Sequence, residues 1–321
     1  MKDHFDKNVQ CLYGMLKRCE LCPQKCRVDR TSGEIGICGL SDAILMDCCL
    51  AHHGEEPPLS GTRGAGMVFL SSCNLKCIYC QNYQISHKAK GTVLNPVDFA
   101  RIMLNIQEMG CHNVELVTPT PQVPGIMDAL RIARREGLTI PFVYNCGGYE
   151  NPEVIKRLDG MVEIYLPDFK YGRDGDGMMF SGVGDYVKNA MASIQEMVRQ
   201  AGDEGRLETD AQGIGKRGVM IRHLVLPGRT ENSFAVLDLI KDHISLEASL
   251  CIMSQYTPIP SVRDHPFLGH RVTQREYDAV VNYAMDLGFD NLFIQTVDER
   301  TCAPDFNRND PFDFDGFKDE G

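Results

Sequence analysis

A chain of 321 residues, of which 43% are hydrophobic and 24% charged, is long enough for one large α/β domain with small appendages. Its formal net charge of -11 offers no basic surface to a phosphate backbone, which argues against a nucleic-acid partner. The charged start of the chain and the lack of a long apolar run predict neither an export signal nor a membrane partner, and hence a cytoplasmic protein.

The chain holds 14 cysteines, which stay reduced in the cytoplasm instead of forming a disulfide framework. Four of them lie close together near the start, at Cys19, Cys22, Cys26 and Cys38. Such a complete set of thiolates is typical of a structural zinc site and equally of an iron-sulfur cluster, so both remain open. We therefore predict an N-terminal extension over residues 1–60 that contains a metal-binding knuckle.

Across residues 61–297, short apolar segments alternate with amphipathic ones, which predicts parallel strands joined by helices. The expected strands lie at residues 67–71, 114–118, 140–145, 162–169, 219–226 and 250–254, with an edge strand at 291–296. The expected helices lie at residues 97–109, 123–136, 152–158, 186–200, 233–243 and 274–287. Six such units are fewer than the eight of a closed barrel. The pattern predicts an α/β fold: an open six-unit (β/α)6 partial barrel, with a doubly wound sheet as the alternative.

Three further stretches depart from this alternation. Residues 172–184 and 202–218 are rich in Gly and charged residues, and we predict that both are surface loops. Residues 298–321 are strongly acidic and carry few apolar side chains other than Phe. This composition predicts a disordered tail, and docking of its Phe residues on a partner is the alternative.

The most informative motif is a set of three cysteines, Cys73, Cys77 and Cys80, directly after the first expected strand of the barrel. Active sites of parallel α/β folds form beyond the carboxyl ends of the strands. Three thiolates hold three irons of a cubane cluster and leave the fourth iron open. A structural zinc is the alternative, but it normally takes four protein ligands, and no fourth cysteine follows nearby. The motif therefore predicts a 4Fe-4S cluster at the barrel mouth.

This motif resembles the signature of the radical S-adenosylmethionine (SAM) superfamily, in which an aromatic residue, here Tyr79, precedes the last cysteine. Further phrases resemble the pyruvate formate-lyase activating enzyme family, in its little-characterised putative-activase branch, over roughly residues 15–295. These phrases are Gly54-Glu55-Glu56-Pro57-Pro58, Leu116-Val117-Thr118-Pro119-Thr120, Tyr165-Leu166-Pro167-Asp168-Phe169-Lys170 and Ile221-Arg222-His223-Leu224-Val225-Leu226-Pro227-Gly228.

The resemblance implies an anaerobic oxidoreductase that binds SAM at the open iron. One electron, from a reductant such as flavodoxin or ferredoxin, then cleaves SAM to a 5'-deoxyadenosyl radical that abstracts hydrogen from a substrate. The implied substrate is a glycyl residue of a partner enzyme. A small metabolite or peptide is the first alternative, and a non-catalytic iron-sulfur or zinc protein is the second.

The resemblance also implies cofactor-binding residues at the strand ends. Asp168 and Lys170 resemble a pair that holds SAM after the fourth strand, and Asn145 and Tyr79 are further candidates for polar contact.

Many superfamily members carry Gly-Gly-Glu after the second strand, whereas this chain has Thr118 and Thr120, whose hydroxyls accept hydrogen bonds from an ammonium.

Arg222 and His223 are adjacent in one strand and must point to opposite faces. We favour His223 as the residue that contacts SAM.

Overall fold

A ten-stranded sheet forms the centre of the computed structural model, which describes residues 2–298 and 303–313. Its order is β10-β9-β8-β6-β5-β4-β2-β1-β3, with β7 paired to β8. Neighbours from β10 through β2 run parallel, while β1 and β3 add antiparallel pairs at one edge. The strands are β1 (Ile44–His52), β2 (Ala65–Leu70), β3 (Thr92–Leu94), β4 (Val114–Val117), β5 (Phe142–Cys146), β6 (Ile164–Pro167), β7 (Leu207–Thr209), β8 (Gly215–Leu224), β9 (Ser249–Met253) and β10 (Leu292–Ile294).

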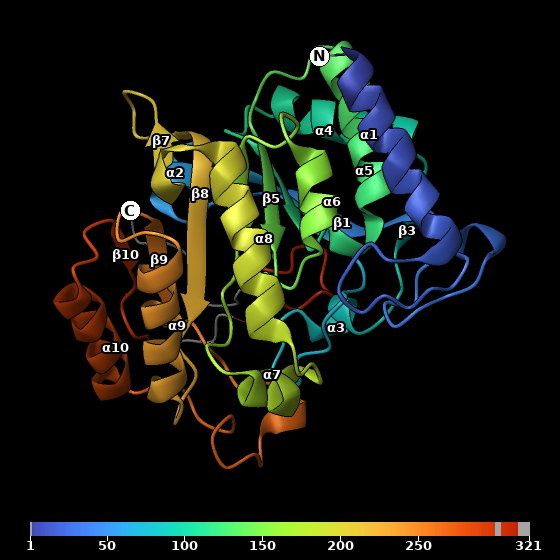
Figure 1. Ribbon diagram of the computed structural model, residues 1–321. Helices are drawn as coiled ribbons and strands as arrows, with labels where there is room; N and C mark the ends of the chain where they lie inside the picture. The colour runs from blue at the N-terminus through green and yellow to red at the C-terminus, as the bar shows by residue number, and fades with distance from the viewer. Residues whose placement is uncertain (1, 299–302, 314–321) are drawn as a thin grey trace.

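Ten α-helices surround this sheet in the described part of the chain, and the longer ones that join consecutive parallel strands cover its outer face, as α8 and α9 do on either side of β8 in Figure 1. They are α1 (Lys2–Gly14), α2 (Pro57–Ser60), α3 (Tyr83–Ser86), α4 (Pro96–Glu108), α5 (Val123–Arg135), α6 (Pro152–Ile155), α7 (Asp174–Ser181), α8 (Tyr186–Ala201), α9 (Thr230–His243) and α10 (Gln274–Leu287). Short 3-10 helices occupy Met15–Arg18, Arg30–Ser32, Thr120–Gln122, Lys156–Leu158, Asp203–Gly205 and Pro260–Val262. In the described part of the chain, no helix has the length and apolar character needed to cross a bilayer.

Local sequence signals explain where several helices begin. Asn95 precedes α4 and accepts a hydrogen bond from the backbone N–H of Asp98, and Pro96 stands at the first helical position. Thr273 and Glu276 form a reciprocal capping box at the start of α10. These caps satisfy backbone donors that the first helical turn leaves without partners.

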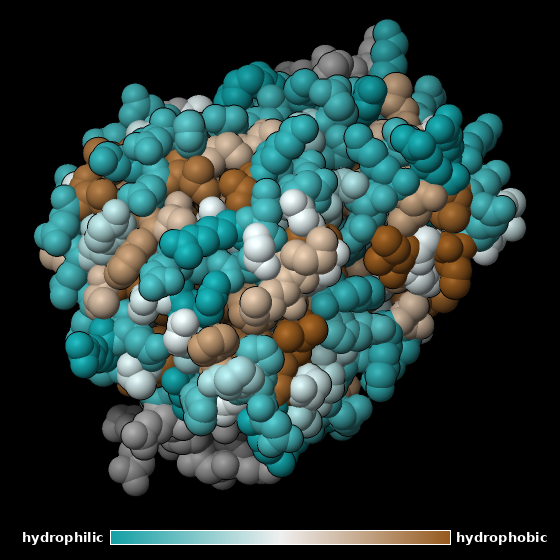
Figure 2. Space-filling view, turned by 60° about the horizontal axis from the view of Figure 1, so that its bottom comes forward, coloured by the Kyte–Doolittle hydropathy of each residue, from teal (hydrophilic) through white to brown (hydrophobic). Residues whose placement is uncertain are grey.

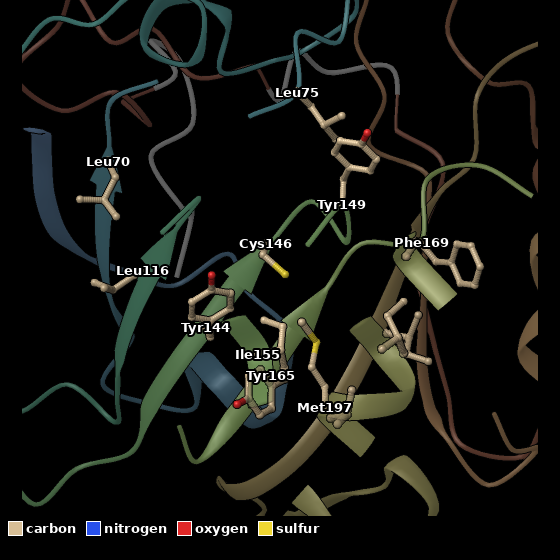
Figure 3. Packing of buried hydrophobic residues seen from close by; sticks show 14 of the residues in the cluster. Leu70, Leu75, Leu116, Tyr144, Cys146, Tyr149, Ile155, Tyr165, Phe169 and Met197 are labelled. Atoms are coloured by element: carbon tan, nitrogen blue, oxygen red, sulfur yellow. The ribbon is translucent and has the colours of Figure 1, made fainter. Parts of the chain in front are cut away.

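The parallel strands separate two kinds of core. Side chains on their outer faces, among them Tyr144, Cys146 and Tyr165, pack against helix side chains such as Met197 of α8 (Figure 3). Side chains on the inner faces fill the concave side in two clusters. One contains Val143, Leu166 and Met220, and the other contains Met67 and Phe69 together with Phe306 from the C-terminal segment. Because adjacent residues of a strand face opposite ways, each strand contributes to both cores.

The α/β partial barrel predicted from the sequence is confirmed, and each of the seven expected strands has a counterpart in the sheet. The first 60 residues contribute β1 to the same sheet through its pairing with β2. Both expected loops need correction. Residues 172–184 contain helix α7, and residues 202–218 contain β7 and the start of β8, which pair as antiparallel neighbours. The glycine content of both segments favoured a prediction of loops, because Gly lowers the local propensity for regular secondary structure. It does not prevent tertiary packing from forming a helix or strand there.

The expected disordered tail also differs from the structure where the structure describes it. Residues 303–313 pack on the inner face of the barrel, with Phe306 only 5% exposed and its ring centroid 5.2 Å from that of Phe69. Gln84 fixes the same segment by hydrogen bonds to Asp305 and to the backbone N–H of Phe306. We call residues 303–313 the C-terminal strap. The remainder of the predicted tail, 299–302 and 314–321, lies outside the described residues.

Candidate active site

The three cysteines lie on the loop that leaves β2, at the carboxyl end of the parallel strands. The chain turns at Ser72, which has a φ of 73°. The side chain of Asn74 donates a 2.6 Å hydrogen bond to the Tyr149 carbonyl, and Figure 3 shows Leu75 beside the Tyr149 ring. The loop is therefore attached to the turn that follows β5.

Each of the three sulfurs has a polar neighbour. Cys77 Sγ accepts a hydrogen bond from the Ser181 hydroxyl at 2.9 Å, and Cys80 Sγ lies 3.2 Å from the Ser86 hydroxyl. Cys73 Sγ accepts from the Leu75 backbone N–H at 3.3 Å. Burial, followed by the charge of Cys77, raises the pKa of the Cys73 thiol to about 12. A metal centre that displaces the protons would relieve this cost, so the three thiols suit cluster ligation.

A cavity of about 360 Å³ opens beside two of these cysteines. Cys77 and Cys80 line it together with polar residues from the ends of several strands, and the C-terminal strap adds Pro304 and Phe312. The residues of the cavity that later arguments use are Glu55, Tyr79, Asn145, Asp168, Lys170 and Arg222. The cysteine loop thus lines the same cavity as four of the predicted cofactor-binding residues, Tyr79, Asn145, Asp168 and Lys170.

Asp168 and Lys170 form an ion pair at the end of β6. Burial opposes ionisation of Asp168, but Lys170 and Arg222 outweigh it and hold the pKa of this carboxyl below its ordinary value. Burial likewise opposes the charge of Lys170, and Asp168 outweighs it, so the pKa of the ammonium lies well above its ordinary value. Both groups therefore stay charged inside the cavity.

Arg222 lies on the inner face of β8 and connects three walls of the cavity. Its guanidinium contacts Glu55 at 2.8 Å, Asp168 at 3.5 Å and the Asn145 side-chain oxygen at 3.3 Å. The Asn145 amide group in turn donates to Glu115 Oε1 at 2.7 Å. Asn145 therefore holds a cation and a carboxylate in place at once.

The expectation that His223 contacts SAM is corrected by the structure. The His223 ring lies on the outer face of β8, fully buried, with Nδ1 2.7 Å from the Phe169 carbonyl and Nε2 2.9 Å from the Ser233 hydroxyl of α9. Burial lowers the pKa of His223 to about 4, so the ring is neutral at pH 7. The register that pairs Arg222 beside Asp168 directs Arg222 inward and hence His223 outward.

The two threonines after β4 do not line the cavity. Thr118 has a φ of 62° and donates its backbone N–H to the Asn145 carbonyl. Thr120 is fully buried, and its hydroxyl donates a 2.7 Å hydrogen bond to Glu150 Oε1. For Thr120, the expected contact with SAM is replaced by a buried contact with a carboxylate.

The N-terminal cysteine quartet folds next to the cysteine loop. The Ser72 hydroxyl donates to the Cys38 carbonyl, and Gln24 donates to the Asn74 carbonyl at 3.0 Å. Burial raises the pKa of Cys22, which also senses the charges of Cys19 and Cys38. Across residues 2–298 and 303–313, however, no three His, Cys, Asp or Glu side chains converge as they would around a single metal ion. A metal at the quartet stays a prediction.

Three carboxylates of this site were missed in the sequence as functional groups. Glu55 and Glu56 precede α2, and Glu115 lies within β4. One signal was present for Glu115, because a charged residue within the apolar run Val114-Glu115-Leu116-Val117 faces a barrel interior only if that interior is polar.

Fold and site together define an α/β protein whose open parallel barrel carries a three-cysteine loop and a charged cavity at its mouth. The family model of the Radical SAM superfamily matches residues 67–240, more than half of the chain, which therefore belongs to that superfamily. Membership implies an enzyme with a 4Fe-4S cluster and SAM. The cysteines with their donors, next to the cavity, fit this pair of cofactors.

Similarity to a curated protein extends beyond residues 67–240. "Uncharacterized protein MJ0674" of Methanocaldococcus jannaschii is 28% identical over 298 residues, which cover 90% of this chain and 80% of the relative. Among solved structures, SuiB of Streptococcus suis bound to SAM is 15% identical with a TM-score of 0.46, and methylornithine synthase (PylB) is 13% identical with a TM-score of 0.49. The SuiB match covers 72% of this chain and 46% of SuiB, and the PylB match covers 71% and 63%. The chain thus spans about half the length of SuiB.

Proposed function

We propose that this chain binds a 4Fe-4S cluster through Cys73, Cys77 and Cys80, and SAM in the adjoining cavity, and abstracts a hydrogen atom from a substrate held in the same partial barrel. The observation that carries the proposal is that Cys77 and Cys80 share one cavity with Asp168 and Lys170. When bound, the cluster supplies the electron that cleaves SAM reductively. Binding and orientation are left to the side chains of this chain.

Lys170 is the residue suited to hold the carboxylate of SAM. Its charge acts on Cys73 and Cys80, and Asp168 keeps it protonated although it is largely buried. A fixed ammonium in a partly dry cavity attracts a carboxylate more strongly than one in water does. Asn145 is a positioning residue, because it acts through its hydrogen bonds with Glu115 and Arg222.

A small polar molecule is the hydrogen donor that the cavity supports best. Pro304 and Phe312 of the C-terminal strap partly cover the cavity, while Arg222 and Glu55 line its interior with charge. Figure 2 turns this end of the molecule toward the viewer, and apolar residues lie on it in separate patches among hydrophilic ones. A large apolar docking surface is therefore not visible on this face.

A glycyl residue of a partner enzyme is the second candidate donor. The phrases that resemble the pyruvate formate-lyase activating enzymes support it, and it requires the C-terminal strap to move aside for a peptide loop. For either donor we propose flavodoxin or ferredoxin as the reductant and an anaerobic, cytoplasmic setting, in which thiols stay reduced. A non-catalytic role is disfavoured, because electron carriers close their clusters with four protein ligands.

Anaerobic reconstitution with iron and sulfide, followed by assay of 5'-deoxyadenosine from SAM and dithionite, tests this function. Cys73→Ala, Cys77→Ala and Cys80→Ala should each lose both the cluster and the product. Cys11→Ala, at an exposed position on α1, is the matched control and should keep both. Full activity in any of the three variants would break the ligand assignment.

Two readouts separate the hydrogen donors. A small-molecule donor should transfer deuterium from a labelled metabolite pool into 5'-deoxyadenosine without any partner protein. A glycyl donor should instead give a glycyl radical, visible by electron paramagnetic resonance, when the partner enzyme, SAM and reductant are mixed.

A further inference from the structure

The C-terminal strap forms one wall of the cavity at the cysteine loop. Pro304 and Phe312 of the strap line this cavity together with residues of the barrel. The ring centroid of Phe312 lies 4.2 Å from that of His52 and 5.5 Å from that of Phe69, and all three rings line the cavity. A segment near the end of the chain thus closes a site whose other walls belong to the barrel.

Hydrogen bonds within the strap fold it into a compact loop. The backbone N–H of Asp305 donates to the Pro311 carbonyl at 2.9 Å, and the Arg308 side chain donates to the Asp313 carbonyl at 2.8 Å. The described residues 303–313 form turns and bends and contain no helix or strand. Because these hydrogen bonds lie within the strap, they persist when it leaves the barrel, so the strap can move as one body.

The attachment of the strap to the barrel buries little of it. Two of its eleven residues, Phe306 and Pro311, are buried. Phe306 packs against Phe69, and Gln84 of α3 bonds to Asp305 and to the Phe306 backbone N–H. Segments with few buried apolar contacts open locally at a lower free energy than that of global unfolding. The strap can therefore detach while the sheet stays folded.

Helix α3, which holds the strap, is also attached to the cysteine loop. The Ile85 carbonyl accepts from the Ser72 backbone N–H at 2.9 Å, and the Ser86 hydroxyl lies 3.2 Å from Cys80 Sγ. Gln84 precedes both residues in the same helix. The strap therefore closes against the loop that carries the proposed cluster ligands.

Two routes lead into this cavity, one past the strap and one through a second cavity of about 430 Å³ beside β10. Glu55 and Arg222 line both cavities and form a 2.8 Å ion pair between them, with side chains only 11% and 13% exposed. Separating a buried ion pair is costly, whereas opening of a weakly attached segment is a local event. The route past the strap is therefore the easier one.

We infer that the C-terminal strap is a lid: it lifts from the inner face of β2 to admit SAM and closes again over the bound molecule. This inference rests on the proposed function, because it takes SAM as the occupant of the cavity. It goes beyond that function in assigning a step, the opening of residues 303–313, that limits how fast SAM enters. A closed lid also keeps water and foreign hydrogen donors away from a radical formed in the cavity.

Binding kinetics test the lid, and the chain allows a specific reporter because it contains no Trp. Phe312→Trp places a single indole in the strap and keeps an aromatic wall. The anaerobically reconstituted variant is mixed with SAM in a stopped-flow fluorimeter without reductant, so that SAM binds and is not cleaved. Because opening must precede entry, the observed rate constant should rise with SAM concentration and reach a plateau at the rate of opening.

Two variants in the Phe312→Trp background loosen the lid. Phe306→Ala removes the buried anchor and should raise the plateau at least roughly tenfold, since loss of a buried aromatic ring costs more free energy than one factor of ten represents. Gln84→Ala removes two hydrogen bonds and should raise it roughly threefold to tenfold. Release of SAM should accelerate together with entry, so the affinity should change less than either rate. Phe267→Ala, at a 38% exposed position outside the strap, is the control and should leave the plateau unchanged.

An observed rate constant that rises linearly to the highest SAM concentration, or a plateau that neither variant changes, would overturn the inference. Entry through the second cavity gives these results. A preparation that carries the cluster but does not bind SAM refutes the proposed function instead. Because Phe312→Trp alone shows whether the plateau exists, the test does not depend on the folding of the two loosened variants.

Discussion

Ser181, the last residue of α7, donates a 2.9 Å hydrogen bond to the Sγ of Cys77, which lies 104 positions earlier in the chain. Its hydroxyl also lies 2.6 Å from that of Tyr171, which is 2.9 Å from the hydroxyl of Tyr79. The segment predicted to be a loop thus supplies a polar contact to a proposed cluster ligand. Hydrogen bonds to ligand sulfurs disperse negative charge and favour the reduced cluster.

Ser181→Ala should therefore lower the reduction potential of the cluster. One such hydrogen bond corresponds to roughly 60 mV for a one-electron couple, if it contributes about 1.4 kcal/mol. A redox titration followed by electron paramagnetic resonance measures the shift. Ser181→Thr keeps the hydroxyl and should restore the wild-type potential. An unchanged potential in Ser181→Ala would show that this contact does not act on the cluster.

The N-terminal cysteine quartet should bind metal independently of the cysteine loop. A triple variant, with Cys73, Cys77 and Cys80 replaced by Ala, should retain metal after reconstitution, because four thiolates form a complete ligand set. Inductively coupled plasma mass spectrometry identifies the metal as zinc or iron. Adding Cys22→Ser should remove it. A metal-free triple variant would mean that the quartet has no metal-binding role.

Arg222 should be indispensable to the stability of the barrel interior. Arg222→Met leaves Glu55, Glu56 and Asp168 without their shared cation, and breaking a buried ion pair typically costs about 3–5 kcal/mol. Urea unfolding at pH 7 measures the loss. At low pH the carboxyl groups are protonated, so the difference from wild type should shrink. A variant that is as stable as wild type at pH 7 contradicts this account.

The buried carboxyl of Glu150 should make stability depend on pH. Burial raises its pKa from 4.5 to about 8, so the folded chain keeps a proton that the unfolded chain loses. Between these two values stability falls as pH rises, by up to about 5 kcal/mol. Glu150→Gln keeps a neutral acceptor for the Thr120 hydroxyl and removes this loss. Urea unfolding from pH 4 to pH 8 should therefore show a flatter profile for the variant, and parallel profiles would refute the assignment.

Phe306 should anchor the C-terminal strap to the barrel. Phe306→Ala removes its buried contact with Phe69, so residues 303–313 should detach while the sheet remains folded. Hydrogen-deuterium exchange should rise across the strap and hardly change in β5. Phe267→Ala, at an exposed position away from the strap, is the control. Unaltered exchange in the strap would mean that other contacts hold it.

Much of the fold follows from local patterns that sequence reasoning can detect. The parallel strands are short apolar runs, and Asn95 and Asn151, each followed by Pro, cap the helices that they precede. The three cysteines and the Asp168–Lys170 pair follow strand ends, which tertiary structure brings to one mouth. In these cases the chemistry of a position depends on its place along a strand.

The remaining features depend on contacts between distant segments. The inward direction of Arg222 follows from its register beside Asp168, which the spacing of residues within β8 does not determine. The composition of the C-terminal strap predicts disorder. The contacts that order it come from Phe69 and Gln84, more than 200 positions earlier, so the local sequence does not reveal them. Glu55 and Glu56 reach Arg222 across 167 and 166 positions, and no local pattern links them.

The sheet ends on both sides in very short strands, β10 and β3, each of three residues. An exposed edge strand offers unpaired backbone groups that a second molecule can extend, and shortness is one way in which natural sheets limit this. Ile294 on one edge is 60% exposed and Val93 on the other 67%, so both edges present apolar side chains with little backbone to pair. Edge-to-edge association of two sheets through these strands is accordingly disfavoured, even though the barrel is open.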